Sequence, residues 1–294
     1  MTSAADWWLG ARPRTLPAAL VPVLVGTSTA VSESAGLASS RVVARATLAL
    51  VVSLSLQVGV NYANDYSDGK RGTDDQREGP IRLVASGRAS PGAVRNAAFC
   101  ALGVACVAGL AIAAVTTWWL VAVGIACVAS AWMYTGGPRP YGYAGYGELF
   151  VFVFFGLVAT IGTSYVIAES FGTLSFLSGV MTGLLAVALL VVNNIRDIEG
   201  DGRSGKRTLA VRLGSERSKW LYVSLFGLAA ATIVAASLQD AGAALGLVGL
   251  LSALPAISTV RHATTASELI RALGMTARVQ IVVGVLYSAG VLLT

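Results

Sequence analysis

Charged residues, cysteine and histidine are scarce in this chain, and each shortage excludes a class of protein. Only 12% of its 294 residues are charged, against about 25% in an ordinary soluble domain, which excludes disorder, a coiled coil and a typical water-soluble enzyme. The three cysteines fall in apolar runs, so neither a disulfide scaffold nor a four-cysteine metal site is expected. One histidine, His262, cannot form a histidine-based metal cluster. The abundant component is hydrophobic sequence, 55% of the chain, which favours a polytopic membrane protein.

Long stretches without any Asp, Glu, Lys or Arg divide the chain into candidate membrane spans. A helix needs about 20 apolar residues to cross a bilayer, and one stretch, 96–138, is long enough for two helices. We therefore expect an all-α bundle of nine transmembrane helices that forms a single membrane-embedded domain over residues 1–294. The expected spans are roughly 15–33, 43–66, 94–115, 118–136, 148–168, 172–196, 218–238, 241–260 and 274–293.

Basic residues are distributed very unevenly over the loops between these spans. Of the 21 basic residues, all but Arg41 and Arg45 lie on the same side as the N-terminus. By the positive-inside rule, we expect the N-terminus in the cytosol, the C-terminus outside, and the protein in the cell (plasma) membrane. Orientation and lipid headgroups then account for the net charge of +6. Because no compact basic stripe carries interleaved aromatic residues, no nucleic-acid partner is expected.

Acidic residues gather in two clusters, each at the cytosolic end of a long apolar span. The first cluster occupies residues 61–75 and the second residues 193–201. In both, polar residues recur at the i, i+3/4, i+7 spacing that puts them on one face of a helix. These stripes are Asn61, Asn64 or Asp65, and Asp68 in the first cluster, and Asn194, Asp197 and Asp201 in the second. Since both clusters face the same leaflet, two helices can direct carboxylates and amides at one another across a shared cavity.

The chemistry of these clusters indicates a divalent cation and a phosphate-bearing substrate. Carboxylates at membrane depth are costly and usually functional, and several in one small site repel each other unless cations neutralise them. Oxygen ligands without Cys or His suit Mg²⁺, which keeps coordination positions for phosphate oxygens. The pattern therefore predicts a phosphate or diphosphate substrate. The basic residues that can complete its charge balance are Lys70, Arg71, Arg139, Lys206 and Arg207.

Over nearly its whole length the chain resembles the UbiA superfamily of intramembrane prenyltransferases, whose signature is two Asp-rich motifs at the ends of the second and sixth spans. Within it, the chain is most similar to the branch that prenylates 1,4-dihydroxy-2-naphthoate in menaquinone synthesis. The segments that carry this closer similarity are 11–17, 64–74, 79–87, 134–138 and 205–214. The chain has Gly72 where many members have a further Asp, which makes Asp74 the alternative, and Arg139 where many have Lys.

The resemblance implies a reaction, a cofactor and a set of site residues. A polyprenyl group would pass from an allylic prenyl diphosphate to 1,4-dihydroxy-2-naphthoate with loss of CO₂, giving demethylmenaquinol, next to membrane lipid. Two Mg²⁺ ions would be bound with the diphosphate. The implied catalytic and metal-binding residues are Asp65, Asp68, Asp197 and Asp201, with Asp74 as a further metal ligand. The implied substrate-binding residues are Asn61, Asn64, Lys70, Arg71, Tyr134, Arg139, Asn193, Asn194, Lys206 and Arg14.

Two alternative functions stay open at this point. One is a UbiA-type prenyltransferase with a different aromatic or alcohol acceptor, such as 4-hydroxybenzoate or a glyceryl phosphate. The more remote one is a cation transporter, because intramembrane carboxylates also mark ion pathways. Against a transporter, the carboxylates gather on one side of the membrane, and basic residues that would oppose cation flow lie among them. Prenyl chain length and oligomeric state do not follow from the sequence.

Overall fold

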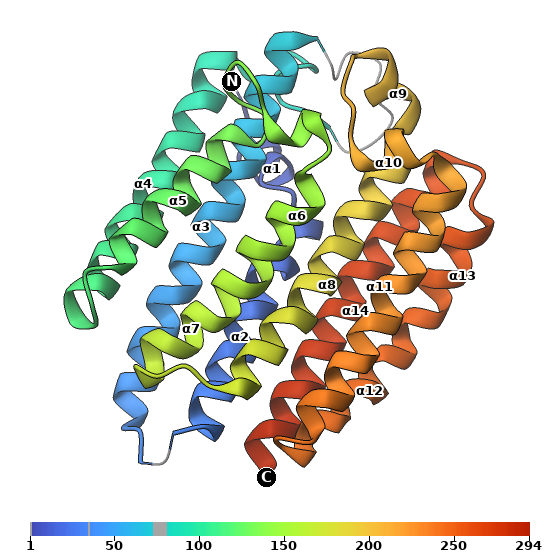
Figure 1. Ribbon diagram of the computed structural model, residues 1–294. Helices are drawn as coiled ribbons and strands as arrows, with labels where there is room; N and C mark the ends of the chain where they lie inside the picture. Colours follow the sequence, from blue (N-terminus) through green and yellow to red (C-terminus); the bar gives the residue numbers. More distant parts are fainter. Residues whose placement is uncertain (1, 35, 73–80) are drawn as a thin grey trace.

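A computed structural model describes residues 2–34, 36–72 and 81–294, and within these ranges the chain forms helices and loops but no β-strand. The longer helices lie side by side along one direction, with the two termini at opposite ends of the bundle (Figure 1). In chain order the elements are α1 (Ala4–Gly10), η1 (Pro13–Thr15), α2 (Pro17–Ser32), α3 (Ser39–Arg71), α4 (Pro91–Val115), α5 (Leu120–Met133), η2 (Tyr141–Ala144), α6 (Gly147–Val151), η3 (Phe152–Val158), α7 (Ala159–Ala168), α8 (Thr173–Arg196), α9 (Ile198–Arg203), α10 (Leu209–Leu213), α11 (Ser215–Ser237), η4 (Ala241–Ala244), α12 (Leu245–Leu250), η5 (Leu251–Ala253), α13 (Leu254–His262) and α14 (Ala266–Leu293).

The expected helical membrane bundle is confirmed, whereas the count of nine crossings is not. Seven helices in the described residues are long and apolar enough to cross a bilayer, and an eighth span results if the bent pair α1–α2 counts as one. The remaining expected span, 118–136, contains only α5, whose 14 residues extend about 21 Å, less than the roughly 30 Å of a bilayer core. Apolar composition predicted this helix correctly but not its length.

The first span is interrupted between α1 and α2, which meet at 55°. Arg12 has φ 54° and ψ 71° and directly precedes Pro13, so the helix cannot continue through this point. A side chain of α3 bridges the interruption: the Asn61 amide nitrogen donates to the carbonyl oxygen of Ala11 at 2.8 Å and to the Thr15 hydroxyl at 3.1 Å. The start of the chain is thereby fixed against the same helix that carries the first acidic cluster.

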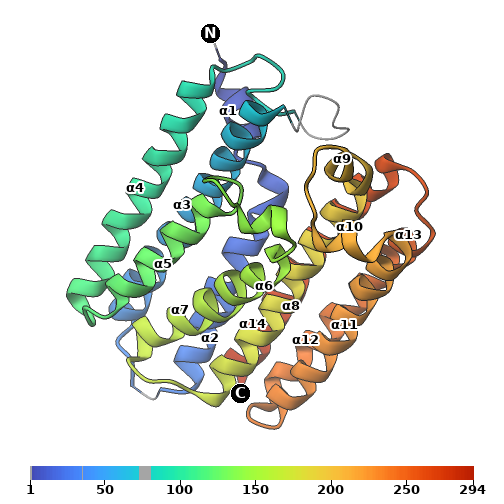
Figure 2. The same cartoon turned by 45° about the horizontal axis from the view of Figure 1, so that its top comes forward.

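Helix α8 is the most buried of the spans and carries the second acidic cluster at its end. It packs against α2, α11, α14 and the π-helical segment η3. Two glycines permit the closest of these contacts, since a Cβ atom on Gly156 would lie 2.4 Å from the Cα of Gly183. A second view shows α6–η3–α7 beside α8, with α4 and α11–α13 at opposite edges of the bundle (Figure 2). This packing sets the C-terminal end of α8 beside the beginning of α6.

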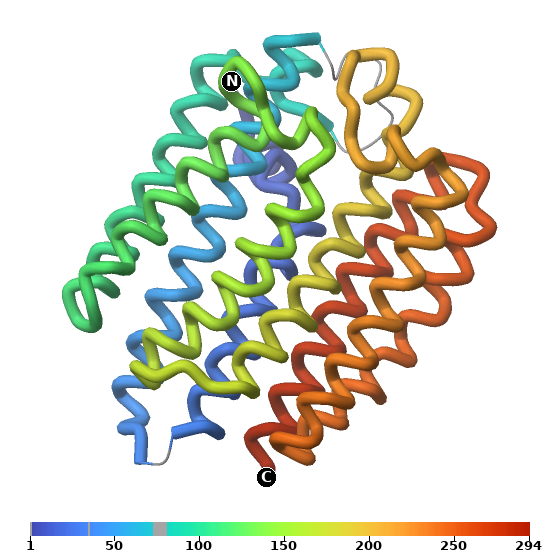
Figure 3. The backbone as a smooth tube through the Cα atoms, in the orientation of Figure 1, coloured from blue at the N-terminus to red at the C-terminus, as the bar shows by residue number. Residues whose placement is uncertain are grey.

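At the opposite end of the bundle, a small ion-pair network joins three helices. Arg41 and Arg45, near the start of α3, lie 2.8 and 2.6 Å from Glu169 in the turn between α7 and α8. Arg45 also donates to the carbonyl oxygens of Val166 and Val115. The bond from Arg45, and then the charge of Arg41, lowers the pKa of Glu169. The smooth trace of the backbone shows the start of α3 and the turn between α7 and α8 at the opposite end of the bundle from residues 198–213 (Figure 3).

Candidate active site

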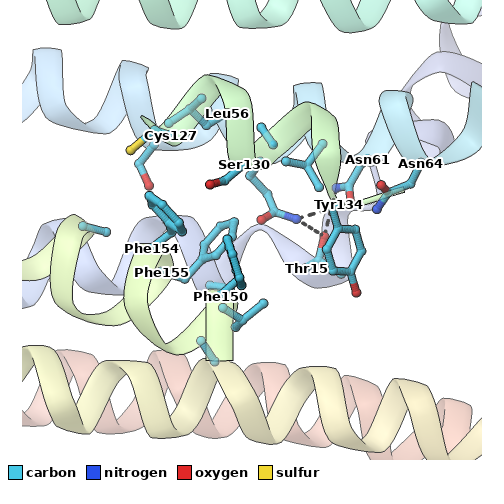
Figure 4. A pocket seen from close by; sticks show the side chains of 18 of the residues that line it. Thr15, Leu56, Asn61, Asn64, Cys127, Ser130, Tyr134, Phe150, Phe154 and Phe155 are labelled. Atoms are coloured by element: carbon cyan, nitrogen blue, oxygen red, sulfur yellow. Dashed lines mark hydrogen bonds between the residues drawn. The ribbon is translucent and has the colours of Figure 1, made fainter. Parts of the chain in front are cut away.

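A cavity of about 1150 Å³ lies inside the bundle and changes character along its length. At one end its wall is polar and belongs to the ends of α3 and α8. Elsewhere it is largely apolar. Phe150, Phe154 and Phe155 line one wall from α6 and η3, with Leu56 and Cys127 across from them (Figure 4). Such a cavity can hold a ligand that has one charged end and a long apolar body.

The polar end brings the two acidic clusters together. The ammonium nitrogen of Lys206 lies 3.2 Å from the Asp68 carboxylate of the first cluster and 3.8 Å from the Asp201 carboxylate of the second. All three side chains line the cavity. One cation therefore reaches both clusters, and the helical stripes in the sequence face one another across a shared space.

Asp197 is paired with a residue that the sequence analysis treated only as a loop charge. The Arg196 guanidinium donates to both carboxylate oxygens of Asp197, each at 2.8 Å, and to the side-chain oxygen of Asn193 at 2.9 Å. Arg196, Asp197 and Asn193 all line the cavity. A guanidinium held in this way adds positive charge to the polar end and fixes the side chains of the second cluster relative to one another.

The asparagines of the two clusters are fixed in opposite orientations. The Thr135 hydroxyl donates to the Asn64 side-chain oxygen at 2.7 Å, which leaves the Asn64 amide nitrogen for the cavity. In contrast, the Asn194 amide nitrogen donates to a carboxylate oxygen of Glu148 at 2.9 Å, which leaves the Asn194 oxygen for the cavity. Since an ionised carboxylate only accepts hydrogen bonds, Glu148 determines which way Asn194 points. Asn64 can thus donate to an anion, and Asn194 can accept from a hydroxyl or bind a cation.

Two residues at this end were not singled out from the sequence. Glu148 lies in the first turn of α6 with only 8% of its surface exposed, and nothing in its short sequence context distinguishes it. The Tyr143 hydroxyl donates to Asp68 at 2.7 Å, and the cations of Arg71 and Lys206 lie 5.0 and 4.7 Å from the centre of its ring. Tyrosines are numerous in this segment, so their spacing gave no signal. Burial raises the pKa of nearby Tyr141, whose neutral hydroxyl donates to the Ser130 carbonyl oxygen.

Several of the sequence-predicted residues do not line the cavity. The buried Asp65 carboxylate accepts hydrogen bonds from the backbone N–H groups of Leu83 and Val84, at 2.8 and 3.0 Å, and so ties α3 to the segment that leads into α4. Arg71 donates to the carbonyl oxygens of Thr135 and Gly137. Lys70 and Arg139 are exposed outside the cavity. Asp74 lies outside the described residues.

The remaining predicted residues are Arg14, Tyr134 and Asn61, and all three line the cavity. Arg14 is exposed. Tyr134 follows the end of α5 and lies near Asn61 and Thr15 (Figure 4). Asn61 donates both of its amide hydrogens to the break between α1 and α2, as described above. The amide N–H groups of Asn61, which we expected to bind substrate, therefore stabilise the cavity wall instead.

The donor set at the polar end fits a hard divalent cation. Oxygen atoms of Asp68, Asp197, Asp201 and Asn194 face one region, and Mg²⁺ prefers oxygen ligands. The ammonium of Lys206 lies between two of these carboxylates, at a place where positive charge is required. No group of three Asp, Glu, His or Cys residues within the described ranges is close enough to hold a metal ion unaided. Ion binding would therefore draw the carboxylates inward from Lys206.

Comparison with known proteins identifies relatives of this chain. Residues 19–275 match the model of the UbiA prenyltransferase family. A Mycobacterium tuberculosis protein named 1,4-dihydroxy-2-naphthoate octaprenyltransferase is 48% identical over 92% of this chain and 91% of its own length. Among solved structures, a UbiA homologue from Aeropyrum pernix has a TM-score of 0.70 at 15% identity, over 92% of this chain and 96% of its own. One from Archaeoglobus fulgidus bound to DMAPP and Mg²⁺ has a TM-score of 0.65 at 15% identity, over 96% of this chain and 99% of its own.

Proposed function

Because the chain belongs to the UbiA prenyltransferase family, we propose that it transfers a polyprenyl group from an allylic prenyl diphosphate to 1,4-dihydroxy-2-naphthoate. The C–O bond to the diphosphate breaks, the new C–C bond forms on the aromatic ring, and the ring loses its carboxyl group as CO₂. The product is demethylmenaquinol, an intermediate of menaquinone synthesis. The mycobacterial relative, similar over nearly its full length, carries this acceptor in its name.

The observation that carries the proposal is a single cavity with acidic clusters at one end and an apolar wall beyond them. The diphosphate binds at the polar end, where Lys206, Arg196 and the Asn64 amide supply donors. The polyprenyl chain extends along the phenylalanine wall. Leu110 and Ile125 line the cavity and are 50% and 66% exposed, and we propose that a long chain leaves the cavity here, directly into lipid.

The proposed ligands for Mg²⁺ are the carboxylates of both clusters, Asp68, Asp197 and Asp201. When bound, two Mg²⁺ ions would neutralise the diphosphate and make it a better leaving group. The Archaeoglobus homologue, which shares the fold, was solved bound to DMAPP and Mg²⁺, and this supports a divalent ion as the cofactor. Asp65 and Asp74 stay predictions as further ligands, because Asp65 bonds to backbone outside the cavity and Asp74 is not described.

The residues around the reacting atoms protect the allylic cation. Aromatic faces stabilise such cations by roughly 0.5–2 kcal/mol each, and Tyr134 lines the cavity near the polar end. The phenylalanine wall excludes water that would otherwise hydrolyse the cation. Lys70, Arg71 and Arg139 lie outside the cavity and are proposed to attract the diphosphate headgroup toward it at the membrane surface.

We further propose a single membrane domain of nine crossings, counting the bent pair α1–α2 and the short α5, with the polar end of the cavity on the cytosolic side of the plasma membrane. An odd number of crossings agrees with termini at opposite ends of the bundle (Figure 1). The basic residues of the loops favour the cytosolic assignment by the positive-inside rule.

A cation transporter is the less favoured function. The acidic residues that line the cavity in the described ranges, Asp68, Asp197 and Asp201, all lie at one end. Further along, Val23, Ala49, Ile112 and Val166 line the wall and belong to one apolar cluster. A hydrated ion would have to cross this apolar segment without any partner, which is expensive.

The direct test is one incubation of purified protein with Mg²⁺, a long prenyl diphosphate and a panel of aromatic acceptors, analysed by mass spectrometry. We expect prenylated and decarboxylated 1,4-dihydroxy-2-naphthoate as the main product, and no product with EDTA until Mg²⁺ is restored. Exclusive use of another acceptor would replace the acceptor assignment. Mg²⁺ flux into liposomes without any prenyl transfer would overturn the function.

A further inference from the structure

The break between α1 and α2 holds an arginine in a strained backbone conformation on the cavity wall. Arg12 has φ 54° and ψ 71°, a left-handed conformation that is uncommon for residues with a side chain. The following Pro13 makes it less favourable still, because a residue before proline prefers an extended backbone. Strained residues of this kind persist where surrounding structure enforces them, and they gather at ligand sites.

Two buried amides of α3 enforce this conformation. Gln57 donates to the Thr15 hydroxyl at 3.0 Å, and Asn61 donates to the same hydroxyl at 3.1 Å and to the Ala11 carbonyl oxygen at 2.8 Å. Thr15 in turn donates to the carbonyl oxygen of Arg12 at 2.9 Å. Figure 4 marks the hydrogen bonds at Thr15 and Asn61 with dashed lines. The turn that carries Arg12 is therefore held on both sides by buried hydrogen bonds.

The charge of Arg12 is available to a ligand. Its side chain lines the cavity, and its guanidinium makes one long hydrogen bond, 3.4 Å, to the carbonyl oxygen of Asn61. In the described part of the chain no carboxylate pairs with it, whereas Arg196 and Lys206 are paired with acidic residues. A guanidinium has five N–H donors in a planar fork that matches a carboxylate. Most of the N–H donors of Arg12 therefore lack an acceptor in the described part of the chain.

The position of Arg12 separates it from the diphosphate. It contacts α3 at Asn61, seven residues from Asp68 and hence about 10 Å further along the helix. We propose that Arg12 binds the carboxylate of the aromatic acceptor and holds its ring beside the prenyl carbon that leaves the diphosphate. This inference rests on the proposed function, and it assigns an arylcarboxylate subsite to the wall formed by the α1–α2 break and α3.

The experiment compares two acceptors, 1,4-dihydroxy-2-naphthoate and 1,4-dihydroxynaphthalene, which lacks the carboxylate. Full-length wild type, Arg12→Gln, Arg12→Lys and the control Arg95→Gln, an exposed arginine of α4, are assayed with both. We expect Arg12→Gln to lower the ratio of kcat/KM between the two acceptors by roughly 10- to 100-fold, the effect of losing a charged hydrogen-bonded pair. The KM for prenyl diphosphate should not change. The ratio for Arg12→Lys should fall between those of wild type and Arg12→Gln, and the ratio for Arg95→Gln should match wild type.

A binding measurement without turnover supplies the second readout. The Kd of 2-naphthoate, an inert arylcarboxylate, should rise in Arg12→Gln by a similar factor, while the Kd of neutral 2-naphthol should not. Conversion of 1,4-dihydroxynaphthalene shows that the variant is folded; if Arg12→Gln does not fold, the same comparisons are read from Arg12→Lys. An unchanged acceptor ratio and an unchanged Kd for 2-naphthoate overturn the inference. A wild-type protein that prenylates neither acceptor overturns the proposed function instead, before any variant is made.

Discussion

The two acidic clusters, the first motif at the end of α3 and the second motif at the end of α8, face one cavity but are held in place in different ways. On α3, the partners of the first motif come from distant parts of the chain: Thr135 bonds to Asn64 and Tyr143 to Asp68. Within the described residues, Arg196 at the end of α8 holds the adjacent Asp197, and Glu148 reaches this motif from another helix. The contacts described for the first motif therefore come from loops that must dock against it, whereas those described for the second come in part from its own helix.

The largest expected effect tests whether the two motifs act as one unit. Asp68→Asn and Asp197→Asn should each lower kcat by about 100-fold or more, because each removes a charged ligand from the diphosphate site. The double variant should be scarcely worse than either single one, as is usual for groups that act together. Prenyl transfer measured by mass spectrometry, with circular dichroism to verify helicity, gives the answer. Near-normal turnover in either single variant would show that the two motifs do not act as one unit.

A second substitution sharpens the contrast inside the first motif. Asp65→Asn keeps one accepting oxygen but sets an amide group against a backbone N–H of Leu83 or Val84. We expect a loss of about 1–3 kcal/mol of stability, seen as a lower midpoint of thermal unfolding, with the Mg²⁺ dependence of activity preserved. The opposite pattern, normal stability with a weakened response to Mg²⁺, would make Asp65 a metal ligand, the role proposed for Asp68.

Glu148→Gln tests the link between the second motif and α6. Glutamine keeps the size of the side chain, but its amide can present either an oxygen or a nitrogen to Asn194, so Asn194 is no longer fixed. We expect kcat to fall by about 10-fold, the effect of one misplaced hydrogen-bonding group.

Adding Asn194→Asp to Glu148→Gln provides the matched rescue. Aspartate presents an oxygen to the cavity whichever way it turns, so part of the lost activity should return. A double variant no more active than Glu148→Gln would show that Glu148 acts in some way other than through the orientation of Asn194.

A smaller effect is expected from the hydroxyl that reaches the first motif. Tyr143→Phe keeps the ring near Arg71 and Lys206 and removes the hydroxyl that donates to Asp68. We expect kcat to fall by about threefold, and Tyr143→Ala, which also removes the ring, to have a greater effect. Steady-state kinetics at saturating Mg²⁺ measure both. Equal effects of the two variants would mean that the ring contributes nothing.

The smallest effect lies far from both motifs, in the ion pairs of Glu169. Because Arg45 and then Arg41 lower its pKa, these pairs contribute stability above the ordinary pKa of a glutamate, and the contribution is lost as pH falls through the lowered value. The side chain is half exposed, so Glu169→Gln should change stability by less than about 1 kcal/mol. Thermal unfolding at neutral pH and below pH 4.5 measures it. Any loss of prenyl transfer at neutral pH would contradict the distance between this network and the polar end of the cavity.

Much of the fold follows from apolar runs, and the facing of the two motifs follows from helical spacing. Asp68, Asp197 and Asp201 could be placed on one cavity because i, i+3/4, i+7 stripes fix a helix face. The length of α5 could not be predicted, since apolar residues continue into the turns on either side of it.

Glu148, Tyr143 and Arg196 were missed for a different reason. Each is a single polar residue whose partner is chosen by tertiary packing, as when the glycine contact between η3 and α8 sets Glu148 beside Asn194. Asn61 shows the converse: its place in the stripe was correct, but its donors bond to a break in the first span that composition does not reveal.

The exposed cavity wall at Leu110 and Ile125, where we propose that the prenyl chain meets lipid, determines which concentration of the prenyl substrate controls the saturation of the enzyme. A chain that reaches the cavity sideways arrives by two-dimensional diffusion, so the relevant measure of abundance is its mole fraction in the leaflet and not its molarity in the buffer. Diluting the prenyl diphosphate with inert phospholipid at constant bulk amount should slow the reaction, whereas enlarging the assay volume should leave the rate per vesicle unchanged. On the proposed function, the bilayer would thus serve as the reservoir for the prenyl substrate.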